Sequence, residues 1–157
     1  MSEKNLLPCI HVAEGDIPPR VLVCGDPQRA QRISQRLENP RCLAQNREYW
    51  TYVGEHKGVS VAVVSHGVGC GGAAIAFESL WRAGAKVIIR TGTCGGMQPD
   101  VTAGSIVVAT AACREEGVTE KMIPLSYPAV ADGEVVAALL DAARQQNIPV
   151  HKGIVLT

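Results

Sequence analysis

Net charge, long apolar runs and paired cysteines are all missing from this sequence of 157 residues. Lys and Arg together number 15, as do Asp and Glu. No electrostatic attraction to nucleic acid or to an anionic membrane is therefore predicted. No apolar run approaches the roughly 20 residues that cross a bilayer. These absences argue against nucleic acid and membrane as partners.

The six cysteines are dispersed, and none forms a C-x-x-C pair. A zinc site is therefore not expected, and the four histidines show no metal-ligand spacing either. The N-terminal segment is too polar for a secretory signal. The sequence predicts a cytoplasmic protein without a bound metal, whose thiols are reduced and buried. The cysteines are Cys9, Cys24, Cys42, Cys70, Cys94 and Cys113.

Strand-like and helix-like runs alternate along the chain, which indicates one α/β domain over residues 1–157. A turn around Lys57-Gly58 should join two strands into a hairpin, and Asp26 and Asp132 should cap helices. Gly84 stands where a helix C-cap is expected. The final strand has no turn or cap after it, so we expect a domain truncated at its C-terminus. Strands are expected at 20–24, 49–56, 59–66, 86–92, 105–115 and 151–157, and helices at 26–39, 72–84 and 133–146.

The stretch SHGVGCGG (65–72) contains the glycine pattern G-x-G-x-x-G of a dinucleotide-binding turn. The acidic residue that such a site needs about 20 residues later is missing, because the strand 86–90 ends in Arg90. An arginine there could hold the 2′-phosphate of NADP, which keeps that reading open as a minority one. We favour the simpler interpretation that these glycines let a helix pack closely against the sheet.

Two arginines fall where ligands bind in open α/β sheets, at the carboxyl ends of strands. Gly25 ends the first strand and Arg29 lies one turn into the following helix, while Arg90 is followed at once by TGTCGG (91–96). Guanidinium groups, hydroxyl groups and exposed backbone N–H groups together suit a tetrahedral oxyanion. The sequence thus favours a phosphate pocket about as strongly as it favours ordinary solvated arginines and a simple glycine turn.

Several motifs, in order, resemble the nucleoside phosphorylase family of hexameric purine nucleoside phosphorylases and uridine phosphorylases. They are VLVCGDPQRA (21–30), NREY (46–49), SHGVGCGGAAIAFESL (65–80), GAKVIIRTGTCGGMQPD (84–100) and YPAVAD (127–132). The resemblance runs from about residue 8 to the end and implies a three-layer α/β sandwich with a central mixed β-sheet flanked by helices. It also implies that phosphate attacks C1′ of a nucleoside, giving free base and ribose 1-phosphate.

The resemblance implies a role for five residues around phosphate. Gly25, Arg29, Arg90 and Thr93 match the family's phosphate ligands, and Arg90 is the residue expected to matter most for catalysis. Arg47 matches an arginine that reaches into the neighbouring subunit's site. The implied form is therefore a homo-oligomer, at least a dimer and in the family usually a hexamer built as a trimer of dimers. No cofactor is implied, because inorganic phosphate is a co-substrate.

Four further residues are implied to contact the nucleoside. His11 resembles a histidine that crosses to the partner's site and meets the sugar 5′-hydroxyl, and Val68 matches a residue under the ribose. Cys94 and Gly95 match the backbone edge along which the base lies. For His11 and Arg47 the alternative is a solvated surface side chain.

The family's second half, which largely chooses between purine and pyrimidine, is absent from this sequence. We expect a purine nucleoside slightly more than uridine. Three alternatives stay open beside the phosphorylase: a nucleosidase using water, a catalytically inert fragment or assembly subunit of the same fold, and an NADP-binding protein. The arginine set argues against the nucleosidase.

Overall fold

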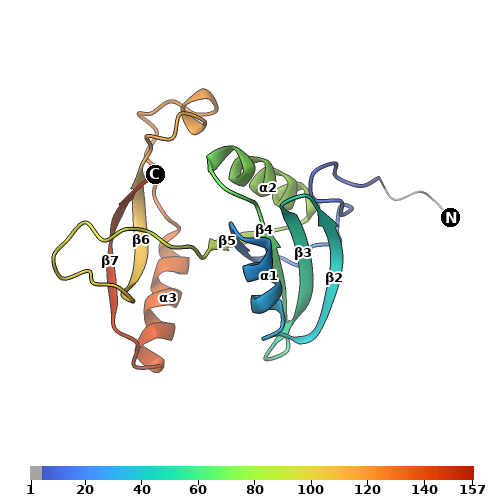
Figure 1. Cartoon of the computed structure of the whole chain (residues 1–157), viewed down its shortest axis with the longest axis horizontal. Helices are drawn as coiled ribbons and strands as arrows, with labels where there is room; N and C mark the ends of the chain where they lie inside the picture. Colours follow the sequence, from blue (N-terminus) through green and yellow to red (C-terminus); the bar gives the residue numbers. More distant parts are fainter. Residues whose placement is uncertain (1–4) are drawn as a thin grey trace. The chain divides into compact units, whose positions relative to one another are not determined.

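The computed structural model describes residues 5–157, and the chain divides into two compact units, one ending at Thr93 and the other spanning Cys94–Thr157 (Figure 1). The expectation of one phosphorylase-like domain over the whole chain stays a prediction.

A five-stranded mixed sheet forms the first unit, with the strand order β2-β3-β4-β1-β5. β1 pairs in parallel with β4 and with β5, whereas β2, β3 and β4 form successive antiparallel pairs. The expected mixed sheet with flanking helices is therefore confirmed. Its elements are β1 (Arg20–Cys24), α1 (Pro27–Ser34), β2 (Glu38–Asn46), β3 (Tyr49–His56), β4 (Val59–Ser65), α2 (Cys70–Ala83) and β5 (Val87–Arg90).

Alternate residues of β1 pack into two separate hydrophobic cores, one on each face of the sheet. Val21 and Val23 belong to a cluster that includes Ala76 and Leu80 of α2. Leu22 and Cys24 belong to a second cluster with Ala30 of α1. Because side chains of a strand alternate between its faces, this division places α1 and α2 on opposite faces. The first unit therefore has three layers, helix, sheet and helix, as Figure 1 shows.

α1 begins as predicted but ends earlier than predicted. The Asp26 carboxylate caps it by accepting the Gln28 N–H at 2.9 Å, and Pro27 occupies the first turn. The helix ends at Ser34 rather than at residue 39. Leu37 continues the apolar spacing of α1. It lies just past the end of the helix and packs into the core that contains Ala30. Because Leu37 is partly buried in this core, the apolar periodicity continues past Ser34 and predicts too long a helix.

The hairpin predicted around Lys57-Gly58 is confirmed, whereas a second hairpin was missed. Lys57 and Gly58 both have positive φ, 50° and 75°, as a tight two-residue hairpin turn requires. β2 was missed because its sequence, ENPRCLAQN, is polar and contains a proline. It forms by pairing with β3 in a register that shifts twice.

The second unit consists of a parallel strand pair, β6 (Ile106–Cys113) and β7 (Val150–Leu156), with α3 (Gly133–Gln145) between them in sequence. The short 3₁₀ turn η1 (Thr119–Lys121) precedes α3. Asp132 caps α3 as expected, because its carboxylate accepts the Val135 N–H at 3.0 Å.

All six cysteines are free thiols, but the expectation that they are buried holds for Cys24 alone. Cys42, Cys94 and Cys113 are exposed. Cys42 belongs to the polar strand β2, and Cys94 to the segment that follows β5, where the chain forms neither helix nor strand. Over residues 5–157, none of the helices is both long and apolar enough to traverse a lipid bilayer.

Candidate functional site

Three parallel strands end side by side in the first unit, and backbone hydrogen bonds tie their ends together. The carbonyl oxygens of Cys24, the last residue of β1, and of Gly25 accept the backbone N–H groups of His66 and Gly67, after β4, each at 2.9 Å. On the other side of β1, the Val23 carbonyl accepts the Thr91 N–H at 2.8 Å. These bonds create one fixed edge from which the following loops emerge.

Arg90 and Arg29 both stand at this edge. Arg90 is the last residue of β5 and pairs with Val23 of β1, and Arg29 is the third residue of α1, directly after the end of β1. Within residues 5–157, neither guanidinium group forms an ion pair with a carboxylate. Two cations without counter-charges at one sheet edge can bind an anion.

The Cys24 thiol, at the end of β1, lies within the electrostatic influence of both arginines. Burial raises the pKa of this thiol, and Arg29 and Arg90 both oppose the increase. Both guanidinium groups thus act on one sulfur atom. Because its pKa is raised, Cys24 carries its proton at neutral pH and adds no negative charge that would compete with an anion.

Arg90 is held in place by a histidine that sequence reasoning did not assign to the site. The Arg90 Nε–H group donates to His66 Nε2 at 3.1 Å. His66 is 2% exposed, and its ring meets Phe77 of α2 edge-on at 6.1 Å. Burial, and next to it the positive charge of Arg90, lowers the pKa of His66. The available sequence signal was a histidine ending an apolar run directly before Gly67.

Arg47 lies in the two-residue turn between β2 and β3, which is tied to the same edge. The Ser65 hydroxyl, at the end of β4, donates to the Glu48 carbonyl at 2.6 Å and accepts the Trp50 N–H at 2.9 Å. Arg47 itself is exposed, with a positive φ of 50°. The structure therefore brings this turn beside the strand ends.

His11 is also exposed, in the segment that precedes β1. The Asn46 side-chain amide, at the end of β2, donates to the Cys9 carbonyl at 2.7 Å and fixes that segment at the same side of the sheet. Val68 is fully exposed in the loop between β4 and α2, and Thr93 is exposed after β5. Cys94 and Gly95 are exposed residues of the second unit.

The glycine pattern of residues 67–72 acts as a packing device in this fold. A Cβ atom on Gly72 would lie 2.3 Å from the His66 carbonyl oxygen, so only glycine lets α2 start this close to the end of β4. Gly67 has a positive φ of 74°, and a Cβ there would lie 2.6 Å from Cγ of Glu48. This geometry supports the packing interpretation over a pyrophosphate-binding turn.

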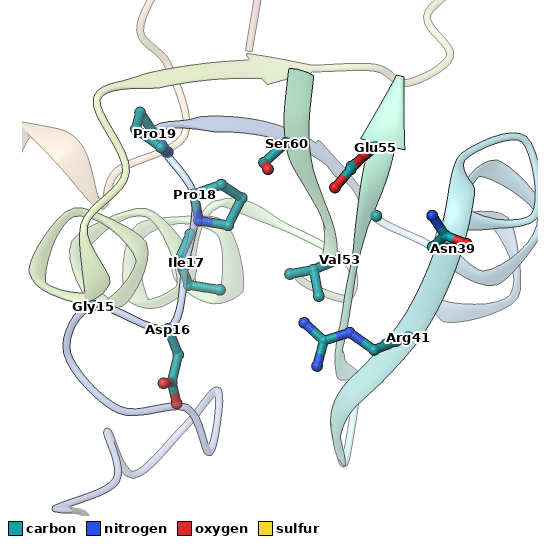
Figure 2. Close-up of a pocket in the computed structure, with 11 residues that line it drawn as sticks. Gly15, Asp16, Ile17, Pro18, Pro19, Asn39, Arg41, Val53, Glu55 and Ser60 are labelled. Atoms are coloured by element: carbon teal, nitrogen blue, oxygen red, sulfur yellow. The ribbon is translucent and has the colours of Figure 1, made fainter. Parts of the chain in front are cut away.

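A separate hollow of about 410 Å³ lies at the opposite end of the sheet, where β1 begins (Figure 2). Pro18 and Pro19 precede β1, and Glu55 and Ser60 form a cross-strand pair near the β3–β4 turn. Arg41 extends toward the hollow from β2. None of the predicted site residues lines it. The described part of the chain also contains no group of three or more His, Cys, Asp or Glu residues that could hold a metal ion.

Residues 19–157 match the family described as the Phosphorylase superfamily, and the chain belongs to that family. It is 43% identical over 151 residues to a purine nucleoside phosphorylase of Plasmodium falciparum, covering 96% of this chain and 62% of the relative. It is 42% identical over 146 residues to a uridine phosphorylase of Thermococcus kodakarensis, covering 92% of this chain and 53% of the relative.

A solved structure of purine nucleoside phosphorylase from Toxoplasma gondii, in complex with immucillin-H, superposes with a TM-score of 0.94 at 38% identity. That comparison covers 100% of this chain and 64% of the other. A uridine phosphorylase from Vibrio fischeri gives a TM-score of 0.87 at 34% identity, with 100% and 65% coverage. This chain therefore spans somewhat less than two thirds of these relatives.

Proposed function

We propose that this chain carries the phosphate-binding part of a nucleoside phosphorylase, a pentosyltransferase that cleaves the N-glycosidic bond of a nucleoside with inorganic phosphate. The observation that carries the proposal is the pair Arg29 and Arg90, which lie at the carboxyl ends of neighbouring strands and form no ion pair with a carboxylate among residues 5–157. Membership of the Phosphorylase superfamily, and relatives named as nucleoside phosphorylases, support it.

The chemistry of the reaction fits such a pair. Cleavage of a glycosidic bond passes through an oxocarbenium-like state, with positive charge at C1′. A phosphate dianion held beneath that carbon stabilises the charge and is placed to attack it. Arginine suits this task because its planar fork grips two oxygens in a fixed geometry and leaves the attacking oxygen free. We assign Arg90 this role, because it ends β5 and its Nε–H group is hydrogen-bonded to His66.

The remaining assignments follow the family resemblance. Gly25, Thr93 and Arg47 are proposed to complete the phosphate site. The nucleoside would be contacted by His11, Val68, Cys94 and Gly95. Arg47 and His11 are exposed at the sheet edge, which suits side chains that serve a neighbouring subunit's pocket. We therefore propose a cytoplasmic homo-oligomer, at least a dimer and preferably a hexamer built as a trimer of dimers.

The base is the least constrained part of the proposal. Relatives named for purine nucleosides and for uridine match this chain at nearly equal identity, 43% and 42%. We lean toward a purine nucleoside because the order of the sequence motifs resembles the purine-type enzymes more closely.

Phosphate binding by the chain tests the proposal without requiring turnover. We expect titration calorimetry to show phosphate binding by the wild type, and Arg90→Ala to weaken it by roughly ten- to a hundredfold. That range corresponds to loss of a hydrogen bond to a charged group, about 1.5–3 kcal/mol. Arg20→Ala is the matched control, because Arg20 is an exposed arginine at the opposite end of the same sheet. Equal affinities for the wild type and Arg90→Ala would remove Arg90 from the site.

Incubation with inosine or uridine, with and without phosphate, then tests the reaction. Release of free base only when phosphate is present supports the phosphorylase. Release without phosphate indicates a nucleosidase instead. Phosphate binding without any release of base indicates the inert assembly subunit.

A further inference from the structure

His66 directly follows β4 and Arg90 ends β5, and these two strands do not pair with each other. β1 lies between β4 and β5 in the sheet, so the hydrogen bond from Arg90 Nε–H to His66 Nε2, at 3.1 Å, crosses the end of β1. His66 is fixed from several sides. The backbone N–H of His66 donates to the Cys24 carbonyl at 2.9 Å. The His66 ring contacts Phe77, and its backbone carbonyl oxygen lies against Gly72. A rigid imidazole therefore faces an otherwise flexible side chain.

The chemistry of the bond assigns the state of the imidazole. A guanidinium group has five N–H donors and no acceptor, so Nε2 must present its lone pair. The imidazole is then neutral, with its proton on Nδ1. The Nδ1 atom is buried, and no group of the described residues forms a hydrogen bond with it in good geometry. The lowered pKa of His66 agrees with a neutral ring.

The bond also decides which part of Arg90 remains available. With Nε engaged, the four N–H groups on the two terminal nitrogens are left for a ligand, and they form a fork that suits two oxygens of one oxyanion. Gly92 leaves room for the guanidinium, because a Cβ atom there would lie 2.5 Å from the terminal nitrogen Nη1. The hydrogen bond to His66 thus restricts the orientation of the fork before any ligand arrives.

We propose that His66 is a positioning residue of the phosphate site: as a neutral imidazole, it holds Arg90 with its terminal nitrogens presented to the phosphate. This inference rests on the proposed function, because it assumes that Arg90 binds phosphate. His66 acts through Arg90 and is not itself assigned a contact with substrate. Preorganising the cation saves the conformational entropy that a long side chain otherwise loses on binding.

Phosphate titrations of variants test the proposal. We expect His66→Leu, which removes the acceptor, to weaken phosphate binding roughly three- to tenfold. His66→Gln keeps a side-chain acceptor and should restore most of that loss. In the Arg90→Ala background, His66→Leu should change the affinity less than twofold, because the two residues act as a unit. His56→Leu is the matched control, since His56 is an exposed histidine at the end of β3.

If His66→Leu also weakens phosphate binding by the full amount, roughly three- to tenfold, in the Arg90→Ala background, His66 supports the fold and does not act by positioning Arg90. Wild-type affinity in a folded His66→Leu protein would equally overturn the proposal. Circular dichroism and thermal unfolding establish that each variant is folded.

A ¹⁵N NMR spectrum of the wild-type chain shows which nitrogen of His66 is protonated. This test requires neither variants nor phosphate binding. We expect His66 to show a protonated Nδ1 and an unprotonated Nε2 at neutral pH, with Arg90 Nε shifted by hydrogen bonding. A proton on Nε2 would overturn the inference outright. If the wild type fails to bind phosphate while the ¹⁵N signature is present, the proposed function fails and the His66–Arg90 bond stands.

Discussion

At the scale of single residues, Gly71 and Gly72 are neighbours in α2 with opposite constraints. A Cβ at position 72 would lie 2.3 Å from the His66 carbonyl oxygen, whereas a Cβ at position 71 meets nothing within 4 Å. We expect Gly72→Ala to lower the free energy of unfolding by roughly 1–3 kcal/mol, because the helix must move away from the strand end. Urea unfolding measures the change.

Gly71→Ala serves as the control for that variant. Alanine favours a helix more than glycine does, so this change should be neutral or stabilising, by at most about 1 kcal/mol. Equal stabilities for the two variants would show that α2 does not depend on its close approach to β4.

Individual residues also show what the sequence could predict of the site. Arg29 and Arg90 were predicted together because Arg29 follows one short apolar strand and Arg90 ends another, and the carboxyl ends of these strands share one edge. His66 was missed, because its partner Arg90 lies 24 positions later in the chain and no spacing rule connects them. The pairing exists only because β1 brings β4 and β5 to a common edge.

At the scale of elements, the α3 N-terminus depends on one carboxylate. The Asp132 side chain accepts the Val135 N–H at 3.0 Å, and α3 shares few core contacts because Ala143 is its single buried residue. We expect Asp132→Ala to destabilise the helix by about 1 kcal/mol. Amide hydrogen exchange measures the effect, and we expect exchange at Val135 to be faster in Asp132→Ala than in the wild type.

Asp132→Asn should behave like the wild type, since asparagine caps a helix about as well as aspartate. If alanine at this position leaves exchange at Val135 unchanged, the cap does not hold the first turn of α3.

Among the elements, β1 was predicted with its correct bounds and β2 was not predicted at all. β1 is an apolar run between Pro18-Pro19 and Gly25-Asp26-Pro27, so local chemistry determines both of its ends. β2 is largely exposed and exists because β3 offers a pairing edge. A strand of that kind depends on tertiary pairing, which a local pattern of apolar residues does not encode.

At the scale of the whole molecule, the buried His66 links stability to pH. Burial and the nearby Arg90 lower its pKa in the folded state below the usual value near 6.5. As pH falls through 6.5, the unfolded chain binds a proton first, so the free energy of unfolding should decrease from there down to the folded-state pKa. Above pH 6.5 this residue contributes no pH dependence. Thermal unfolding from pH 8 to pH 5 measures the trend.

His66→Gln removes the titrating group, so its stability should decline less over the same acid range. A variant whose decline matches that of the wild type would assign the pH dependence to other residues.

β1 contributes alternate side chains to two different cores while its backbone is bonded on both sides. Substitutions in this strand can be accommodated one at a time within either layer. Deleting a single residue of β1 would instead turn every following side chain of the strand to the opposite face of the sheet. It would also displace Arg29 relative to Arg90. Natural variation in this strand should therefore consist of replacements and exclude changes of length.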